Sequence, residues 1–280
     1  MTLPRLVATD LDGTLLRPDT TVGARTRRAL DRVRAAGVLV VPVTARSPIG
    51  LVGIAEPAGF DSWGVCANGA YAWHFGESRA LFSVAIETEV VRELLTGLRA
   101  AVPSARFAVV RNYGWDFVAE EGYAALSVHR DHSIQPRVMR RGTLVDLAAE
   151  PCLKIVVRSS EHTPAELFDA VAGLGIEGCT PTLSGAPFLE VAAAGVSKAT
   201  GLARLCELLK IADGDVVAFG DARNDVEMLT WAGHGVAMGN AMPEAQVAAD
   251  EILPATNADE AVADWLEGLL AGVPPAQSTS

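Results

Sequence analysis

The sequence is short of basic residues. Its 280 residues include 23 Lys and Arg against 34 Asp and Glu, which gives a formal net charge of −11. Proteins that bind nucleic acids or anionic membranes without sequence specificity use Lys and Arg to reach the phosphates. The shortage therefore argues against a nucleic-acid or membrane partner, although a local basic pocket can exist within an acidic chain.

Cysteines and long hydrophobic runs are also scarce. The apolar run 37–45 is far too short to span a membrane, and no longer run exists. Because the first predicted strand begins at Leu6, a cleavable signal peptide would remove part of the fold, so we expect a cytoplasmic protein. The four cysteines form no C-x-x-C pair and no zinc-type spacing with histidine, which predicts free, buried thiols in a reducing compartment. They are Cys66, Cys152, Cys179 and Cys206.

The chain has ample material for a core, and predicted strands and helices alternate near both of its ends. Half of the residues are hydrophobic, and a length of 280 residues suggests two domains or one domain with a large insertion. Buried strands are predicted at 6–9, 38–44, 63–67, 216–220 and 235–238, and helices at 23–36, 198–209 and 225–232. This alternation predicts an α/β fold with a Rossmann-like, doubly wound parallel sheet.

The middle of the chain has a different pattern. Strand-like stretches at 106–111, 114–118 and 153–158 occur with predicted helices at 87–101 and 164–173. We therefore expect an α+β domain inserted into the sheet domain. The expected divisions are a first core part at 1–82, the inserted domain at 83–186, a second core part at 187–271 and a disordered, Pro- and Ser-rich tail at 272–280.

Two carboxylates follow the first predicted strand, in the sequence Asp10-Leu11-Asp12-Gly13-Thr14. Open α/β sheets bind ligands at the carboxyl ends of their strands. Residues two apart on a regular strand point to opposite faces, but Gly13 lets the backbone turn so that both carboxylates can reach one site. One carboxylate could then attack a substrate while the other transfers protons, with a divalent cation nearby. Taken alone, the segment could also be an Asp-rich turn with solvated charges.

Other polar residues end predicted strands or begin predicted helices. Thr44 ends the second strand and offers a hydroxyl and a backbone N–H to an anion, although a Thr at this place is often only a turn residue. Lys198 begins a helix, where a cation is unfavourable unless it faces a bound anion; the alternative is a surface lysine. In Gly220-Asp221-Ala222-Arg223-Asn224-Asp225, Asp221 ends a strand and offers the oxygen ligand that Mg²⁺ prefers.

In this order, these residues resemble the four motifs of the haloacid dehalogenase (HAD) superfamily. The region between Asn68-Gly69-Ala70 and Lys198 looks like the type IIB cap of Cof-like sugar-phosphate phosphatases. The segments 188–191, 195–198 and 235–241 also match that family, so the resemblance covers nearly the whole chain. It implies a Mg²⁺-dependent phosphatase that hydrolyses small phosphorylated metabolites, such as sugar phosphates, through an aspartyl-phosphate intermediate.

The resemblance also implies a role for each matching residue. Asp10 would be the nucleophile and Asp12 the general acid/base. Phosphate binding would involve Thr44, Ala45, Arg46, Lys198 and Asn224, and Mg²⁺ would be bound by Asp10, the backbone carbonyl of Asp12, and Asp221. Asp225 would support Lys198 or a metal-bound water. The family often has Gly where this chain has Ala45, and Arg46 could either bind substrate or form only a surface ion pair.

Two other functions stay open at this stage. A phosphomutase of the same superfamily would shield the aspartyl-phosphate from water. A non-catalytic phosphometabolite-binding protein would lack Asp10 or Asp12, and both are present. The sequence leaves the particular substrate and the oligomeric state open.

The inserted domain also holds a basic segment, with His129, His132, Arg137, Arg140 and Arg141. It could be a solvated loop, or it could face the substrate and recognise a second anionic group.

Overall fold

The computed structural model describes residues 3–128 and 139–271, which form two compact units. The first unit comprises the described parts of Met1–Thr44, Val52–Leu81 and Lys198–Ser280. The second comprises the described parts of Ala45–Leu51 and Phe82–Ser197. The predicted tail at 272–280 lies outside the described residues.

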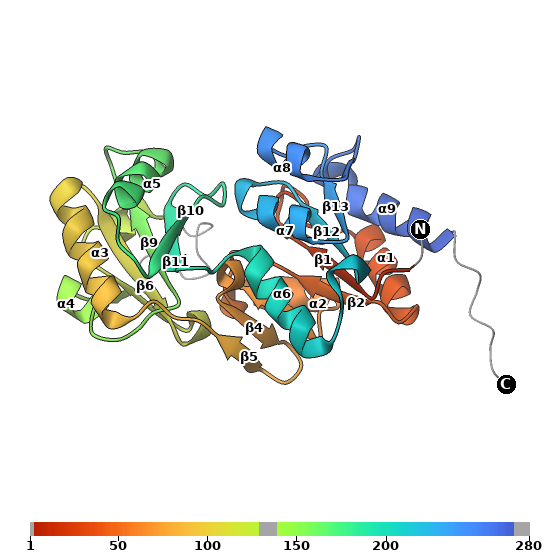
Figure 1. Ribbon diagram of the computed structural model, residues 1–280, viewed down its shortest axis with the longest axis horizontal. Helices are drawn as coiled ribbons and strands as arrows, with labels where there is room; N and C mark the ends of the chain where they lie inside the picture. The colour runs from red at the N-terminus through yellow and green to blue at the C-terminus, as the bar shows by residue number, and fades with distance from the viewer. Residues whose placement is uncertain (1–2, 129–138, 272–280) are drawn as a thin grey trace. The chain divides into compact units, whose positions relative to one another are not determined.

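A five-stranded parallel sheet forms the centre of the first unit, in the order β14-β13-β12-β1-β2 (Figure 1). Its strands are β1 (Leu6–Thr9), β2 (Leu39–Pro42), β12 (Val216–Gly220), β13 (His234–Ala237) and β14 (Glu251–Ile252). All residues of β1 and β12 are buried, as expected for central strands that are covered on both faces.

Two groups of helices flank this sheet (Figure 1). In one group α1 packs against α9, and in the other α7 packs against α6 and α8. Helix α1 buries Thr26, Ala29, Leu30 and Val33, which share one face because they lie three or four residues apart. The helices are α1 (Ala24–Ala35), α2 (Val52–Ala58), α6 (Lys198–Leu209), α7 (Val226–Trp231), α8 (Pro243–Ala248) and α9 (Ala261–Ala271). The unit therefore has the predicted Rossmann-like α/β fold.

A second, three-stranded sheet of the first unit follows β2. It consists of β3 (Trp63–Cys66), β4 (Tyr71–His74) and β5 (Arg79–Ser83), whose last two residues are counted with the second unit. The predicted third strand of the parallel sheet is thus β3, but it pairs antiparallel with β4. A single parallel bridge between Val43 and Val65 connects it to the end of β2.

The second unit is built on a six-stranded, largely antiparallel sheet in the order β10-β11-β9-β6-β7-β8. The strands are β6 (Arg106–Arg111), β7 (Asp116–Ala119), β8 (Arg140–Arg141), β9 (Lys154–Arg158), β10 (Cys179–Thr182) and β11 (Leu189–Ala193). The helices are α3 (Thr88–Ala101), α4 (Leu144–Leu147) and α5 (Pro164–Gly173). The expected α+β architecture is therefore present.

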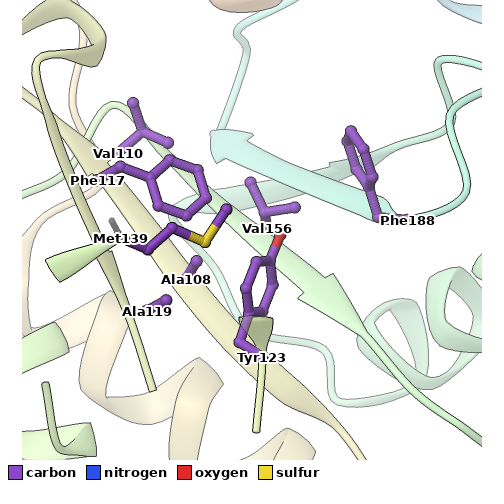
Figure 2. Close-up of a cluster of buried hydrophobic side chains, with 8 residues drawn as sticks. All are labelled: Ala108, Val110, Phe117, Ala119, Tyr123, Met139, Val156 and Phe188. Carbon is purple, nitrogen blue, oxygen red and sulfur yellow. The ribbon is translucent and has the colours of Figure 1, made fainter. Parts of the chain in front are cut away.

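Both faces of this sheet bury apolar side chains. Figure 2 shows the cluster on one face, where Val110 and Phe117 are cross-strand partners and lie near Tyr123 and Val156. The cluster comprises Ala108, Val110, Phe117, Ala119, Tyr123, Met139, Val156 and Phe188. Because side chains alternate along a strand, Phe107 and Val109 point to the opposite face, where they are also fully buried.

The structure corrects the expected second boundary between the two parts. We expected the core to resume at 187, but the first unit resumes at Lys198. The reason is β11, which pairs with β9 and β10 of the second unit. A fully buried strand that is apolar apart from Glu190, such as Leu189–Ala193, fits the interior of either sheet, so its local pattern does not assign it. The short segment Ala45–Leu51 also belongs to the second unit.

All four cysteines are free thiols, as predicted, but Cys179 is only half-buried, which corrects the expectation that all are buried. Between residues 3 and 128 and between 139 and 271, we find no helix with the length and apolarity that a membrane crossing requires.

Candidate active site

The predicted site residues of the first unit lie at the ends of neighbouring elements. Strands β1 and β12 are parallel neighbours, and the N–H of Asp10 donates to the carbonyl oxygen of Phe219 at 3.0 Å. Asp10 and Asp221 therefore follow adjacent strand ends, where open sheets bind ligands. Lys198 is the first residue of α6, and Asp225 directly precedes α7.

Lys198 joins two buried carboxylates. Its Nζ donates to Oδ1 of Asp10 and to Oδ1 of Asp225, each at 2.6 Å. The exposed fractions of Asp10, Lys198 and Asp225 are 4%, 2% and 0%. Oδ2 of Asp225 accepts the backbone N–H groups of Asp221 at 3.1 Å and Ala222 at 3.0 Å. Both oxygens of Asp225 are thus engaged, and this carboxylate anchors Lys198.

The charged groups at this site strongly shift one another's pKa values. Burial raises the pKa of Asp10 well above its usual range; the Lys198 ammonium opposes this shift, and the charges of Asp225, Asp221 and Asp12 add to it. Burial also raises the pKa of Asp221, to about 6, with the charges of Asp225 and Asp12 as further causes. Burial alone would lower the pKa of Lys198, but Asp10 and Asp225 raise it above its ordinary value. The site therefore holds excess negative charge.

The turn after Asp10 is shaped around Asp221. Gly13 has φ +86°, and a Cβ at this position would lie 2.3 Å from Oδ2 of Asp221, so only glycine leaves room for that carboxylate. The hydroxyl of Thr14 donates to Oδ1 of Asp221 at 2.7 Å. Nδ2 of Asn240 donates to the carbonyl oxygen of Gly13 at 2.8 Å. The sequence analysis assigned no role to Thr14 or Asn240, although both lie within the segments that carry the resemblance.

Asp10 and Asp221 have the donor chemistry of a divalent-cation site. Carboxylate oxygens of Asp10, Asp221 and Asp225 lie within 4.8 Å of one another. The bonds described above engage Oδ1 of Asp10 and of Asp221, and within residues 3–128 and 139–271 their Oδ2 atoms accept no hydrogen bond. Mg²⁺ is usually bound by one or two carboxylates together with water and substrate oxygens. These two carboxylates fit such an ion, whereas both oxygens of Asp225 are already engaged.

Thr44 lies at this edge of the sheet, but its backbone N–H is engaged. The residue is 1% exposed, and its N–H donates to the carbonyl oxygen of Val65 at 2.9 Å. This corrects the expectation that the N–H is offered to an anion, because the N–H bonds to β3 beside the single bridge between Val43 and Val65. Only the hydroxyl of Thr44 can serve that purpose.

Ala45 and Arg46 belong to the second unit. The half-buried Arg46 donates to the carbonyl oxygen of Gly50 at 3.3 Å, and Ala45 accepts a hydrogen bond from Nζ of Lys154 at 3.0 Å. Their contacts with substrate stay a prediction.

Asn224 is held by a residue to which the sequence analysis gave no role. Its Nδ2 donates to Oδ1 of Asn68 at 3.0 Å, across 156 positions of sequence. The signal available in the sequence was the Asn68-Gly69 pair, which is typical of a tight turn but does not reveal this contact.

Asp12 is exposed to solvent, and its charge contributes to the raised pKa values of both Asp10 and Asp221. Its carboxylate therefore lies near the buried pair and is open to water, as a proton-transfer group requires.

The basic segment of the second unit is described only in part. His129, His132 and Arg137 lie outside the described residues. Arg140 and Arg141 form the exposed strand β8, and Arg140 pairs with Asp116 through two hydrogen bonds at 3.0 and 2.8 Å.

Comparison with known proteins identifies the family. Residues 7–266 match the family model of haloacid dehalogenase-like hydrolases. The HMP-PP phosphatase of Cronobacter sakazakii is 31% identical over 251 residues, which cover 86% of each chain. Phosphatase YwpJ of Bacillus subtilis is 27% identical, with 95% of this chain and all of the relative aligned.

Solved structures agree with this family. A phosphatase of the HAD superfamily from Bacteroides thetaiotaomicron superimposes with a TM-score of 0.81, 25% identity and 95% coverage of both chains. A haloacid dehalogenase-like hydrolase from B. subtilis gives a TM-score of 0.79 and 26% identity over 95% of this chain and 99% of that chain. The chain therefore belongs to the haloacid dehalogenase-like hydrolases, as an enzyme of the phosphatase type.

Proposed function

We propose that this phosphatase hydrolyses small phosphorylated metabolites, such as sugar phosphates, through an aspartyl-phosphate on Asp10. The observation that carries the proposal is the buried Asp10–Lys198–Asp225 chain beside Asp221. It combines a carboxylate nucleophile, a fixed cation and a second carboxylate at one sheet edge. Phosphoryl transfer needs this combination of positioning and charge neutralisation.

In the first step, a carboxylate oxygen of Asp10 attacks the phosphorus, and the bond from phosphorus to the leaving oxygen breaks. The exposed carboxyl group of Asp12 donates a proton to that oxygen, so the product leaves as an alcohol. In the second step, Asp12 removes a proton from water as the water attacks the phosphorus. Inorganic phosphate is released and the Asp10 carboxylate is restored.

The phosphoryl oxygens need donors that are in place before the reaction. Lys198 supplies a buried ammonium that Asp225 keeps in position, and Thr44 supplies a hydroxyl. A donor fixed in a dry site stabilises charge that develops in the transition state, because it needs no reorganisation.

A Mg²⁺ ion would be held by Asp10, Asp221 and the backbone carbonyl of Asp12, and would neutralise charge on the transferring phosphoryl group. The mutual repulsion of the buried Asp10 and the half-buried Asp221 carboxylates supports this assignment, because a cation would relieve it.

The proposal is tested by turnover of p-nitrophenyl phosphate and of a panel of phosphorylated metabolites, with Mg²⁺ and with EDTA. We expect release of inorganic phosphate that requires Mg²⁺. Conversion of a sugar phosphate into its isomer, with little release of phosphate, would indicate a phosphomutase. Binding without turnover would indicate a non-catalytic protein. The cytoplasmic location stays a prediction.

A further inference from the structure

A second buried lysine lies in the second unit. Lys154, the first residue of β9, is 9% exposed, and its Nζ donates to Oε1 of Glu190 on β11. Glu190 is 2% exposed. Val110, the cross-strand partner of Lys154, belongs to the apolar cluster of Figure 2. The ion pair therefore lies next to buried apolar side chains.

Stability does not account for this ion pair. Two charges lose their hydration when they are buried, and replacement of such a pair by apolar residues of similar volume is often neutral or stabilising. An apolar pair at positions 154 and 190 would serve the packing of the sheet equally well. The buried charges therefore point to a further contact of the Lys154 ammonium.

That contact is with the backbone directly after Thr44. Nζ of Lys154 donates to the carbonyl oxygen of Ala45 at 3.0 Å, and both residues belong to the second unit. The preceding carbonyl oxygen, that of Thr44, accepts the N–H of Asn68 at 3.0 Å. Two successive peptide carbonyls are thus held, one by a backbone N–H and the other by an ammonium group.

A peptide whose carbonyl is held also has its N–H fixed in direction. The peptide group is planar and trans, so its N–H points opposite to its C=O. The bond from Asn68 therefore orients the N–H of Ala45, and the bond from Lys154 orients the N–H of Arg46. Within the described residues, the N–H of Ala45 donates to no group of the protein. Donation from a cation also polarises the peptide, which makes the N–H of Arg46 a stronger donor.

We propose that Lys154 is a positioning residue of the phosphatase, which holds the peptide Ala45–Arg46 in the orientation that binds the phosphoryl group. The inference rests on the proposed function, because the phosphoryl group is the acceptor that these N–H groups meet. Lys154 acts through the backbone and not on the substrate itself. Glu190 fixes the ammonium of Lys154, as Asp225 fixes that of Lys198.

Lys154→Met tests the inference, because it removes the donor and keeps a side chain of similar length. It should lower kcat/KM about 10- to 100-fold, as expected for a displaced site group. The loss should be similar for p-nitrophenyl phosphate and for the best substrate of the metabolite panel, because both present the same phosphoryl group to the peptide. A loss confined to the metabolite would mean that Lys154 contacts the organic part of the substrate. That outcome, or full activity with both substrates, would overturn the inference.

A double variant separates positioning from stability. Lys154→Met leaves Glu190 buried without its cation, which destabilises the protein. Lys154→Met combined with Glu190→Leu removes both charges, so its free energy of unfolding in urea should be at least that of the wild type. Its kcat/KM should nevertheless stay as low as that of Lys154→Met alone. Activity that returns together with stability would make the role of Lys154 structural and the inference wrong.

Glu190→Gln is the matched control. The amide keeps an acceptor for Nζ of Lys154, which can still donate to the carbonyl oxygen of Ala45. The kcat/KM of this variant should therefore stay close to that of the wild type. A loss as large as that in Lys154→Met would assign the effect to Glu190 and would count against the inference.

A measurement without turnover distinguishes failure of this inference from failure of the proposed function. In nuclear magnetic resonance spectra of the ligand-free protein with isotope-labelled arginine, the backbone amide signal of Arg46 is identified by its loss in Arg46→Lys. Because this N–H shares a peptide with the carbonyl of Ala45, the signal should move in Lys154→Met and stay in place in Glu190→Gln. An unmoved signal in Lys154→Met overturns the inference even if the wild type is active. A moved signal with an inactive wild type supports the fixed peptide and contradicts only the proposed function.

Discussion

The ammonium group of Lys198 lies 2.6 Å from Oδ1 of Asp10, and both residues are almost completely buried. Lys198 is one of only three lysines in the chain. Removing both charges from water is costly, so a buried ion pair is weak support for stability. Its value here is chemical, because the ammonium opposes the burial that raises the pKa of Asp10 and so favours the ionised nucleophile.

Asp10→Asn should abolish hydrolysis of p-nitrophenyl phosphate, with a loss of more than about 10³-fold, because an amide cannot act as the carboxylate nucleophile. The variant should still fold, since Lys198 keeps its bond to Asp225. Steady-state kinetics measures the loss, and circular dichroism checks the fold. Activity retained in a folded variant would contradict the covalent mechanism.

Asp12→Asn should separate the two half-reactions. Loss of a general acid/base typically costs about 10²–10⁴ in rate. A substrate with a good leaving group needs little protonation, so its first step should suffer least, while hydrolysis of the aspartyl-phosphate still lacks its base. Rapid-quench experiments should then show a burst of phosphoenzyme with such a substrate. Equal losses for good and poor leaving groups, without a burst, would assign Asp12 another role.

The local pattern of the sequence was sufficient to predict most of the strands and helices of the first unit. Strand β12 and helix α6 have the predicted limits, Val216–Gly220 and Lys198–Leu209, because a buried run that ends at glycine and an amphipathic stretch are local signals. Strand β11 was not predicted, because its assignment depends on pairing with β9, more than thirty positions away. Non-local pairing leaves no mark in a short segment whose residues are all apolar except Glu190.

The same distinction applies to the site. That Asp10 and Asp221 follow neighbouring strands could be predicted, because parallel strands bring their carboxyl ends to one edge. The bond from Thr14 to Asp221 could not, since the two residues are 207 positions apart and neither has an unusual local context. The engaged N–H of Thr44 was missed for a related reason, because the carbonyl oxygen that accepts it belongs to Val65 on β3, and no local signal marks that contact.

Lys198→Met should destabilise the metal-free protein by about 3–5 kcal/mol at pH 8, because it leaves two buried carboxylates without their cation. Denaturation with urea measures the free energy of unfolding. The loss should shrink near pH 5, where a proton can neutralise one carboxylate. The double variant Asp10→Asn, Lys198→Met should regain part of the stability, because one of the two charges is gone. A double variant as unstable as the single one would show that packing of the lysine, and not its charge, is the cause.

Asp221→Asn should stabilise the metal-free protein at high pH. The pKa of Asp221 is raised from 3.8 to about 6 by burial, so the folded state holds its proton more tightly than the unfolded state. The stability that this proton provides is fully present below pH 3.8 and is lost as the pH rises through about 6. A shift of this size corresponds to about 2–3 kcal/mol. The variant should therefore be more stable than the wild type by about this amount at pH 8, with little difference near pH 4.

Asp19→Asn serves as the control, because its effect on stability at high pH should be opposite to that of Asp221→Asn. Hydrogen bonds from the side chain and backbone of Thr21 lower the pKa of this exposed carboxyl group, so its contribution is present at high pH and is lost as the pH falls. Its replacement should lower the free energy of unfolding slightly at pH 8 rather than raise it.

Saturating Mg²⁺ should make the wild type more stable than Asp221→Asn. The ion binds the ionised carboxylate, so it stabilises only the wild type, and only above about pH 6. A metal-free Asp221→Asn variant that is less stable than the wild type at pH 8 would show that the hydrogen bond from Thr14 outweighs the repulsion among the carboxylates of the site.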